Sequence, residues 1–276
     1  MYIDSSMRKS QEIIDVENAQ YIYSKYFNDK KSFKTLIFTP KEKKRDGSHA
    51  WSVEPYHKEV MAWLKDVMAK NGVMETTYRR AGDNDWGRQY LTYGQFGVQR
   101  LQQNLRAFLC KMTDYDISNS HYTFLLKLAK FHNLPHTYIE QYCNNPQQQR
   151  ETVNKEKMDM IAIMYQDKPH NHQNKWLKSL ALEIEQVRNY LCENVFDSFK
   201  PSKESQNPKG SILSQGLQGC EDQIIQKIID HFQIENVVKM FDGFMTDQSL
   251  TEQEINEYLA SFEEGKGITI KIKVPD

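Results

Sequence analysis

The sequence predicts an α+β protein in which a helix-rich middle is framed by a few short strands. Apolar residues recur at helical spacing through most of the central part of the chain. Residues 268–274 (ITIKIKV) instead alternate strictly between apolar and polar, which is typical of a strand. Residues 237–245 (VVKMFDGFM) carry Asp242 and Gly243 between apolar residues, the commonest signal for a tight β-hairpin.

The composition limits the classes of protein that the chain can belong to. Its 276 residues, 39% of them hydrophobic, can build one large domain or two smaller ones. The mean hydropathy of -0.75 indicates a very polar exterior. No stretch approaches the ~20 apolar residues of a membrane span, and the N-terminus lacks an apolar signal region. We therefore expect no membrane partner and an intracellular protein, with nucleus, cytoplasm and viral factory not distinguished.

The first half of the chain is mixed. Residues 16–27 and 55–70 are expected to be helices, and residues 35–39 (TLIFT) a short strand. Residues 73–97 contain four glycines and many aromatic residues, which indicates short strands and loops. Residues 109–117 (LCKMTDYDI) are then expected to form a strand that ends in acidic residues.

The second half is mostly helical until the hairpin. A loop rich in proline, serine and lysine is expected at residues 199–210. A final pair of elements, a helix and the alternating strand, follows the hairpin. The helices are expected at residues 119–134, 136–143, 153–165, 175–197, 213–232 and 250–262.

Two acidic sites stand at the ends of apolar strands. Asp114 and Asp116 close the strand at 109–117, and Asp242 sits in the hairpin. If these strands are neighbours, their carboxylates converge, and paired carboxylates are what two-metal phosphoryl transfer requires. The simpler interpretation, that Asp242 only belongs to a hairpin turn, remains open. Asp116 is preferred to Asp114 as the metal ligand because Asp116-Ile-Ser-Asn begins the expected helical turn, which would place its carboxylate beside the following helix.

The predicted helix at 153–165 places Lys157, Ile161 and Tyr165 on one face. Such a lysine can neutralise a triphosphate, and a tyrosine two turns further can pack on a base or sugar. The alternative is an ordinary amphipathic helix.

The order of these segments is similar to that of the family A DNA polymerases and the single-subunit phage-type RNA polymerases. The likeness extends over residues 79–276, and the form DISNSH is closest to divergent viral or transposon-type members. The segments that carry it are GRQYL (87–91), RLQQNLRAFL (100–109), DYDISNSH (114–121), KMDMIAIMY (157–165), SQGLQGCEDQIIQKIIDHF (214–232) and MFDGFM (240–245).

The resemblance implies a right-hand palm with a small antiparallel sheet, together with helical fingers. The chain then divides into an N-terminal helical or mixed segment (1–72), a first part of the palm (73–135), the fingers (136–200) and a second part of the palm (201–276). Implied cofactors are Mg²⁺ or Mn²⁺, and implied partners are a DNA primer–template, nucleoside triphosphates and a processivity or replisome partner.

The resemblance also assigns residue roles. Asp116 (alternatively Asp114) and Asp242 are the implied metal ligands, Lys157 offsets triphosphate charge and Tyr165 closes over the nascent pair. The implied contacts to template, primer or nucleotide are Arg88, Gln102, Arg106, Arg150 and Gln218. His121, five residues after Asp116, is the position that excludes a ribose hydroxyl in the DNA enzymes, although a helix-start histidine that caps or packs is an equal alternative.

Two departures leave the function open. The glycine that follows the fingers tyrosine is Gln166 here, and the family's His-Asp-Glu becomes Phe241-Asp242-Gly243, which has lost one carboxylate. The leading hypothesis is a template-directed DNA polymerase. The alternatives are a catalytically inactive polymerase-like subunit that binds nucleic acid or acts as a scaffold, and a primase or phage-type RNA polymerase.

Overall fold

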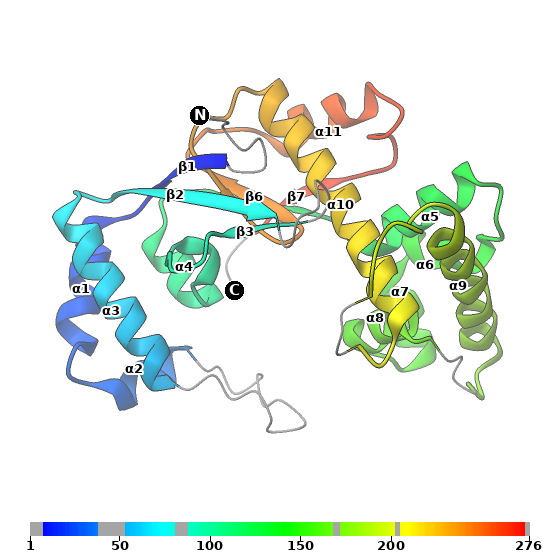
Figure 1. Cartoon of the computed structure of the whole chain (residues 1–276), viewed down its shortest axis with the longest axis horizontal. Helices are drawn as coiled ribbons and strands as arrows, with labels where there is room; N and C mark the ends of the chain where they lie inside the picture. Colours follow the sequence, from blue (N-terminus) through cyan, green and yellow to red (C-terminus); the bar gives the residue numbers. More distant parts are fainter. Residues whose placement is uncertain (1–7, 38–52, 81–87, 168–171, 202–204, 274–276) are drawn as a thin grey trace.

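Helices and small antiparallel sheets make up the protein, which confirms the α+β class (Figure 1). The structure is a computed structural model. In Figure 1 the sheets lie in the centre, with helices α1 to α3 at one end and helices α5 to α9 at the other. The structure describes residues 8–37, 53–80, 88–167, 172–201 and 205–273.

The first sheet has the order β1-β2-β3 and is antiparallel throughout. Its strands are β1 (Arg8–Ile13), β2 (Val73–Arg80) and β3 (Gln89–Leu91). Strand β1 was not predicted from the sequence. Its buried side consists partly of polar residues, Ser10 and Glu12, so no alternation of apolar and polar residues marks the strand.

The second sheet has the order β5-β6-β4-β7, again antiparallel. Strand β4 (Thr113–Ile117) lies between β6 (Gly243–Thr246) and β7 (Ile270–Ile272). Strands β5 (Val237–Lys239) and β6 form the predicted hairpin, closed by a hydrogen bond from the Met240 amide to the Gly243 carbonyl at 3.0 Å. The backbone of Val237 also bonds to the Ser10 hydroxyl, which joins the two sheets.

One face of the second sheet packs on the larger of two hydrophobic cores. Tyr115 and Phe244 stack on each other there, with ring centroids 5.0 Å apart. The opposite face contributes Val238 and Met245 to the second core. Because side chains alternate along a strand, Asp114 and Asp116 share this opposite face with Met245.

The N-terminal helices build the second core. They are α1 (Val16–Tyr26), α2 (Lys30–Ile37), α3 (Val53–Ala69), the 3₁₀ turn η2 (Val98–Arg100) and α4 (Gln103–Leu109). The strand expected at 35–39 is wrong for residues 35–37, which belong to α2; residues 38 and 39 lie outside the described part. Helix α2 forms because it buries Phe33 between the rings of Tyr26 and His57, and this packing overrides local strand propensity.

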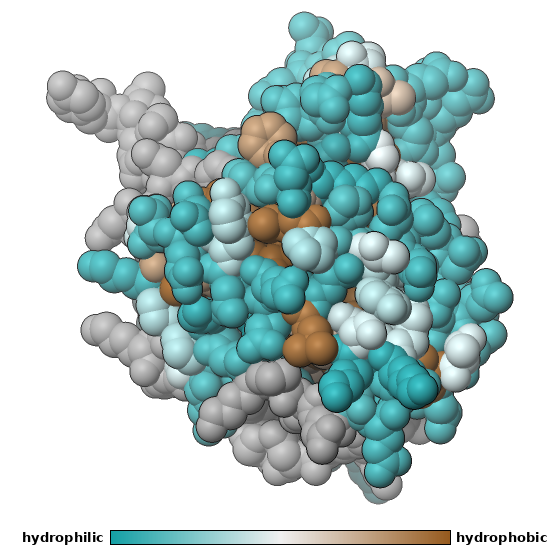
Figure 2. Space-filling model, turned by 90° about the vertical axis from the view of Figure 1, so that its right-hand side faces the viewer, coloured by the Kyte–Doolittle hydropathy of each residue, from teal (hydrophilic) through white to brown (hydrophobic). Residues whose placement is uncertain are grey.

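The central helices form a bundle at the other end of the molecule. They are α5 (Ser120–Phe131), α6 (Thr137–Asn144), α7 (Pro146–Val153), α8 (Lys157–Tyr165) and α9 (Lys175–Asn194). Figure 2 shows that hydrophilic residues cover most of this end, with a few hydrophobic residues visible near its centre. The single helix predicted at 153–165 is wrong at its start, because Asn154 adopts a left-handed conformation (φ 51°) that ends α7.

Helix α10 (Pro208–His231) runs from the bundle to the sheet, and α11 (Glu252–Ala260) lies beside β7 (Figure 1). The loop expected at 199–210 ends early, because Pro208 occupies the first turn of α10. Helix α4 likewise extends to Leu109, so the strand expected at 109–117 begins only at Thr113.

A buried carboxyl group lies beneath the first sheet. Glu12 accepts hydrogen bonds from the Tyr78 hydroxyl and the Val98 amide, each at 2.9 Å. Burial raises its pKa from 4.5 to about 7, against the lowering effect of these bonds. The charged form of Glu12 is therefore disfavoured in the folded protein.

Candidate functional site

Asp116 and Asp242 meet on the second sheet, although 125 residues separate them in the chain. Asp116 pairs with Gly243 across β4 and β6, and the Ile117 amide donates to the Asp242 carbonyl at 2.9 Å. Asp242 lies in the turn of the β5–β6 hairpin. Both interpretations of the hairpin segment therefore hold: Asp242 is a turn residue, and it also faces a second carboxylate.

Gly243 makes this meeting possible. A Cβ atom at position 243 would stand 1.9 Å from the carbonyl oxygen of Tyr115. The side chain of a glutamate at this position would therefore collide with β4. The close approach of the hairpin to β4 therefore leaves no room for a side chain at position 243.

The two carboxyl groups differ in how easily they ionise. Burial and, next, the negative charge of Asp242 raise the pKa of Asp116 from 3.8 to about 7. Burial alone would raise the pKa of Asp242 too, but the hydrogen bond from Asp116 and the positive charges of Lys273 and Arg88 hold it below its usual range. Asp116 is thus the harder of the two carboxyl groups to ionise, and Asp242 the easier.

Lys273, which follows β7, supplies a cation to this pair. Its Nζ atom lies 3.0 Å from Asp116 Oδ1, and its amide donates to the Asp114 carbonyl at 2.8 Å. The lysine side chain is 42% exposed, so it reaches the carboxylates from solvent. Nothing in the sequence alone singled out Lys273; the signal is its place in the alternating strand that borders β4.

Asp114 lies two residues before Asp116 on β4, with its side chain on the same face of the sheet. Arg106 Nη2 is 3.7 Å from Asp114 Oδ2, and burial raises the pKa of the carboxyl group. A cavity of about 310 Å³ adjoins it, lined among others by Arg106, Met112 and Lys273. Asp116, and not Asp114, contacts Asp242. Asp116 lies within the strand, whereas the expected helical turn begins only at Ser120.

The carboxylates suit a hard divalent cation in ligand type. Mg²⁺ is commonly bound through one or two carboxylates together with substrate phosphates and water. Asp114 Oδ1 is buried without a hydrogen-bond partner in the described residues, as an oxygen reserved for a ligand would be. Within the same residues, no three histidine, cysteine or acidic side chains are grouped closely enough to hold a metal alone. A metal here would take its further oxygen ligands from water or a substrate.

A network of polar side chains connects the acidic pair to the helical bundle. Arg88 lies 5.4 Å from the centroid of the Phe241 ring and donates to Glu221 Oε2 at 2.8 and 3.0 Å. His121 Nε2 is 3.0 Å from Glu221 Oε1, and its Nδ1 is hydrogen-bonded to the Tyr165 hydroxyl. We call Arg88, Glu221, His121 and Tyr165 the Glu221 network.

Glu221 is fully buried on α10, and the Ser120 hydroxyl also donates to it, at 2.5 Å. The neighbouring Asp222 binds Lys239 Nζ at 2.9 Å and Arg80 Nη2 at 2.9 Å. Sequence reasoning missed both acids, because they sit within an amphipathic helix and no nearby basic residue marks them. Only the long-range pairing of α10 with the sheets reveals their partners.

The remaining predicted residues lie outside this cluster. Lys157 is exposed at the first turn of α8, and Arg150 Nη1 lies 3.4 Å from the Tyr142 hydroxyl. Gln102 precedes α4, and its backbone N–H donates to the Tyr56 hydroxyl. The side-chain amide of Gln218 donates to the Ser214 hydroxyl. Gly87 lies outside the described residues.

Comparison with known protein families finds no family model that matches the chain, and no curated protein matches its sequence significantly. Among the described helices, none is both long and apolar enough to cross a membrane.

Proposed function

We propose that the protein is a template-directed DNA polymerase that extends a primer by two-metal phosphoryl transfer. The observation that carries the proposal is the contact of Asp116 with Asp242 on one face of an antiparallel sheet. The resemblance of the motif order to family A polymerases supports it. In the proposed right-hand arrangement, the second sheet belongs to the palm and the helices at 136–200 to the fingers.

The acidic pair would hold the metal ions, with Asp114 as a further carboxylate on the same face. Bound Mg²⁺ supplies Lewis acidity, lowering the pKa of the primer hydroxyl and balancing charge on the triphosphate. Metal binding requires both carboxylates ionised, so Asp116 must first lose its proton. The ammonium of Lys273 must also move from Asp116, and its exposure permits this.

The other residues would position the substrates. Arg88 lies beside Asp242 and can contact a phosphate if it releases Glu221. Arg106 faces the cavity next to Asp114, which suits the primer end. Lys157 is exposed on the same helix as Tyr165, where it can meet a triphosphate. Tyr165, held by His121, would lie under the nascent base pair.

Primer extension tests the proposal directly. We expect a DNA primer–template to be extended with deoxynucleotides and Mg²⁺ or Mn²⁺, and extension to be lost in Asp116→Asn and Asp242→Asn. Asp197→Asn, which changes an exposed carboxylate at the end of the bundle, is the matched control and should extend normally. Incorporation of ribonucleotides without a primer would instead indicate a primase or phage-type RNA polymerase.

A second candidate is a catalytically inactive polymerase-like subunit that binds nucleic acid. The ion pair between Lys273 and Asp116 favours it, because a cation already offsets the charge that a metal would offset. This candidate predicts that DNA binds while no metal or nucleotide condition yields extension. It also predicts that Mn²⁺ leaves the stability of the wild type unchanged.

A further inference from the structure

Strand β7 and the residue after it place two lysines beside the aspartates of β4. Lys271 pairs with Asp116 across the two strands, and the Lys273 amide donates to the Asp114 carbonyl at 2.8 Å. Both lysines are exposed. Lys273 Nζ lies 3.0 Å from Asp116 Oδ1, whereas Lys271 makes no ion pair within the part of the chain that the structure describes. Lys273 therefore acts on the acidic pair in a way that its neighbour Lys271 does not.

Lys273 holds a positive charge where the proposed metal would bind. Its ammonium contacts an oxygen of Asp116, and its charge also helps to keep Asp242 ionised. A metal ion bound to the same carboxylate meets a like charge at close range, which costs free energy. A metal that enters the site must consequently displace the lysine.

The displaced ammonium has a second place beside the site. Lys273 also lines the cavity of about 310 Å³ next to Asp114, together with Gln103, Arg106 and Thr113. The guanidinium of Arg106 is 14% exposed and stands 3.7 Å from Asp114 Oδ2, which is longer than a direct hydrogen bond. Two cations and two neutral hydrogen-bonding side chains around one cavity suit a phosphate group.

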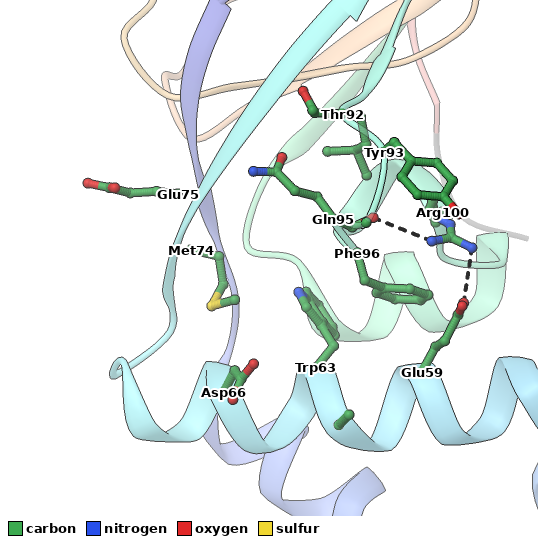
Figure 3. Close-up of a pocket in the computed structure, with 13 residues that line it drawn as sticks. Glu59, Trp63, Asp66, Met74, Glu75, Thr92, Tyr93, Gln95, Phe96 and Arg100 are labelled. Atoms are coloured by element: carbon green, nitrogen blue, oxygen red, sulfur yellow. Dashed lines mark hydrogen bonds and ion pairs between the residues drawn. The ribbon is translucent and has the colours of Figure 1, made fainter.

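The cavity in the N-terminal part of the molecule does not suit a phosphate. It measures about 740 Å³ and lies between α3, β2 and the segment that follows β3 (Figure 3). Among the described residues that line it, Arg100 is the single cation, whereas Glu59, Asp66 and Glu75 are acidic. Figure 3 shows that Arg100 is already bound, to the Gln95 carbonyl at 3.3 Å and to Glu59 at 3.0 Å. Phosphates are therefore assigned to the cavity beside Asp114.

We propose that Lys273 couples the binding of a primer strand to the binding of the metal. Without nucleic acid, the ammonium neutralises Asp116 and keeps the metal affinity low. The backbone phosphate next to the primer end binds in the cavity at Arg106, draws Lys273 away and leaves Asp116 free for Mg²⁺. By linkage, bound metal strengthens primer binding by the same factor. The inference rests on the proposed function, because it places a primer end at the acidic pair.

Isothermal titration calorimetry with Mg²⁺ tests the metal half of the inference on the DNA-free protein. At pH 9, Asp116 is ionised, since its pKa is about 7. Burial lowers and the nearby carboxylates raise the pKa of Lys273, with a net rise, so the lysine remains charged. Lys273→Met should raise the Mg²⁺ affinity about tenfold, and Lys273→Gln should reproduce this rise should the first variant misfold.

Two further variants control for charge and position. Lys273→Arg keeps the positive charge and should retain the wild-type Mg²⁺ affinity. Lys271→Met removes a lysine from the same strand, opposite Asp116, without breaking a described ion pair. This matched control should change the Mg²⁺ affinity less than about twofold.

Fluorescence anisotropy with a fluorescein-labelled DNA primer–template tests the nucleic-acid half. At saturating Mg²⁺, Lys273→Met should weaken binding about fivefold and reduce the slope of log Kd against log salt concentration by about one. In EDTA the same substitution should cost less than about twofold, because Asp116 then holds the wild-type ammonium. Lys227→Met, which removes an exposed lysine of α10 beside α11, should leave DNA binding unchanged in both conditions.

Three outcomes would overturn the inference. These are an unchanged or lower Mg²⁺ affinity in Lys273→Met, an equal rise in Lys271→Met, and a loss of DNA affinity in Lys273→Met that is the same in EDTA as in Mg²⁺. None of these measurements requires primer extension. If extension fails while both binding results are as expected, the proposed function fails and the coupling stands. If extension succeeds without them, only the inference about Lys273 fails.

Discussion

Replacing Asp242 with asparagine is expected to make the metal-free protein more stable at pH 8. In the wild type, folding brings two carboxyl groups together and buries them, so ionising both costs free energy. The substitution would keep the size of the side chain and remove its charge. Asp116 would then face only Lys273, an opposite charge 3.0 Å away.

The size of the effect follows from the pKa of Asp116. A rise from 3.8 to about 7 corresponds to about 4 kcal/mol for ionisation at pH 8, at 1.36 kcal/mol per pH unit. Burial, the larger cause, persists in the variant, and the side chain remains partly accessible to water. We therefore expect Asp242→Asn to raise the free energy of unfolding by about 1–2 kcal/mol at pH 8.

The pH dependence fixes the sign of the effect. A carboxyl group whose pKa is raised on folding contributes stability below its unfolded pKa, and this stability is lost as the pH rises through the folded value. The gain from Asp242→Asn should therefore be largest at pH 8 and shrink at pH 5.5, where Asp116 is protonated in the wild type. Asp197→Asn should change little at either pH.

Urea unfolding with chelator, and again with Mn²⁺, provides the assay. A metal bound only by the folded wild type at ten times its Kd should add about 1.4 kcal/mol, whereas Asp242→Asn should gain nothing. Mn²⁺ should therefore narrow or reverse the difference in free energy of unfolding between Asp242→Asn and the wild type. A less stable Asp242→Asn protein at pH 8 without metal would refute the reasoning, because the carboxylate would then be needed to hold the turn.

Three further predictions test the surroundings of the site. Gly243→Ala should destabilise the fold by about 2 kcal/mol in thermal melts, because its Cβ would meet the Tyr115 carbonyl at 1.9 Å. Wild-type stability should fall between pH 5 and 8 by up to about 3 kcal/mol from Glu12 alone, and Glu12→Gln should flatten this profile in urea titrations. Arg88→Ala should cost about 3 kcal/mol by leaving Glu221 buried without its cation, and adding Glu221→Gln should restore most of that loss.

The hairpin and the acidic pair could be predicted because their signals are local. Asp-Gly between apolar residues determines a turn, and two acids at strand ends suggest a common edge. The sequence alone could not predict that β4 pairs with β6. That pairing depends on contacts between residues more than 100 positions apart, and no periodicity within a strand contains this information.

The errors in the element boundaries have a related cause. Residues 35–37 favour a strand locally, yet they are helical because Phe33 on the same helix fills the N-terminal core. The stop at Asn154 was also missed, since a single residue in the left-handed region interrupts an otherwise continuous helical pattern. Lys273 and Glu221 were not predicted as site residues, because their partners, Asp116 and Arg88, are distant in the sequence.

The position of β4 in its sheet determines when a complete site can exist during synthesis. Asp116 leaves the ribosome with neither neighbouring strand, because β6 and β7 both belong to the last 34 residues of the chain. The whole helical bundle is translated before Asp242. Until then β4 has two open edges, each able to pair with another strand. An N-terminal fragment that includes β4 and stops before the hairpin therefore contains one carboxylate of the pair and an unprotected strand.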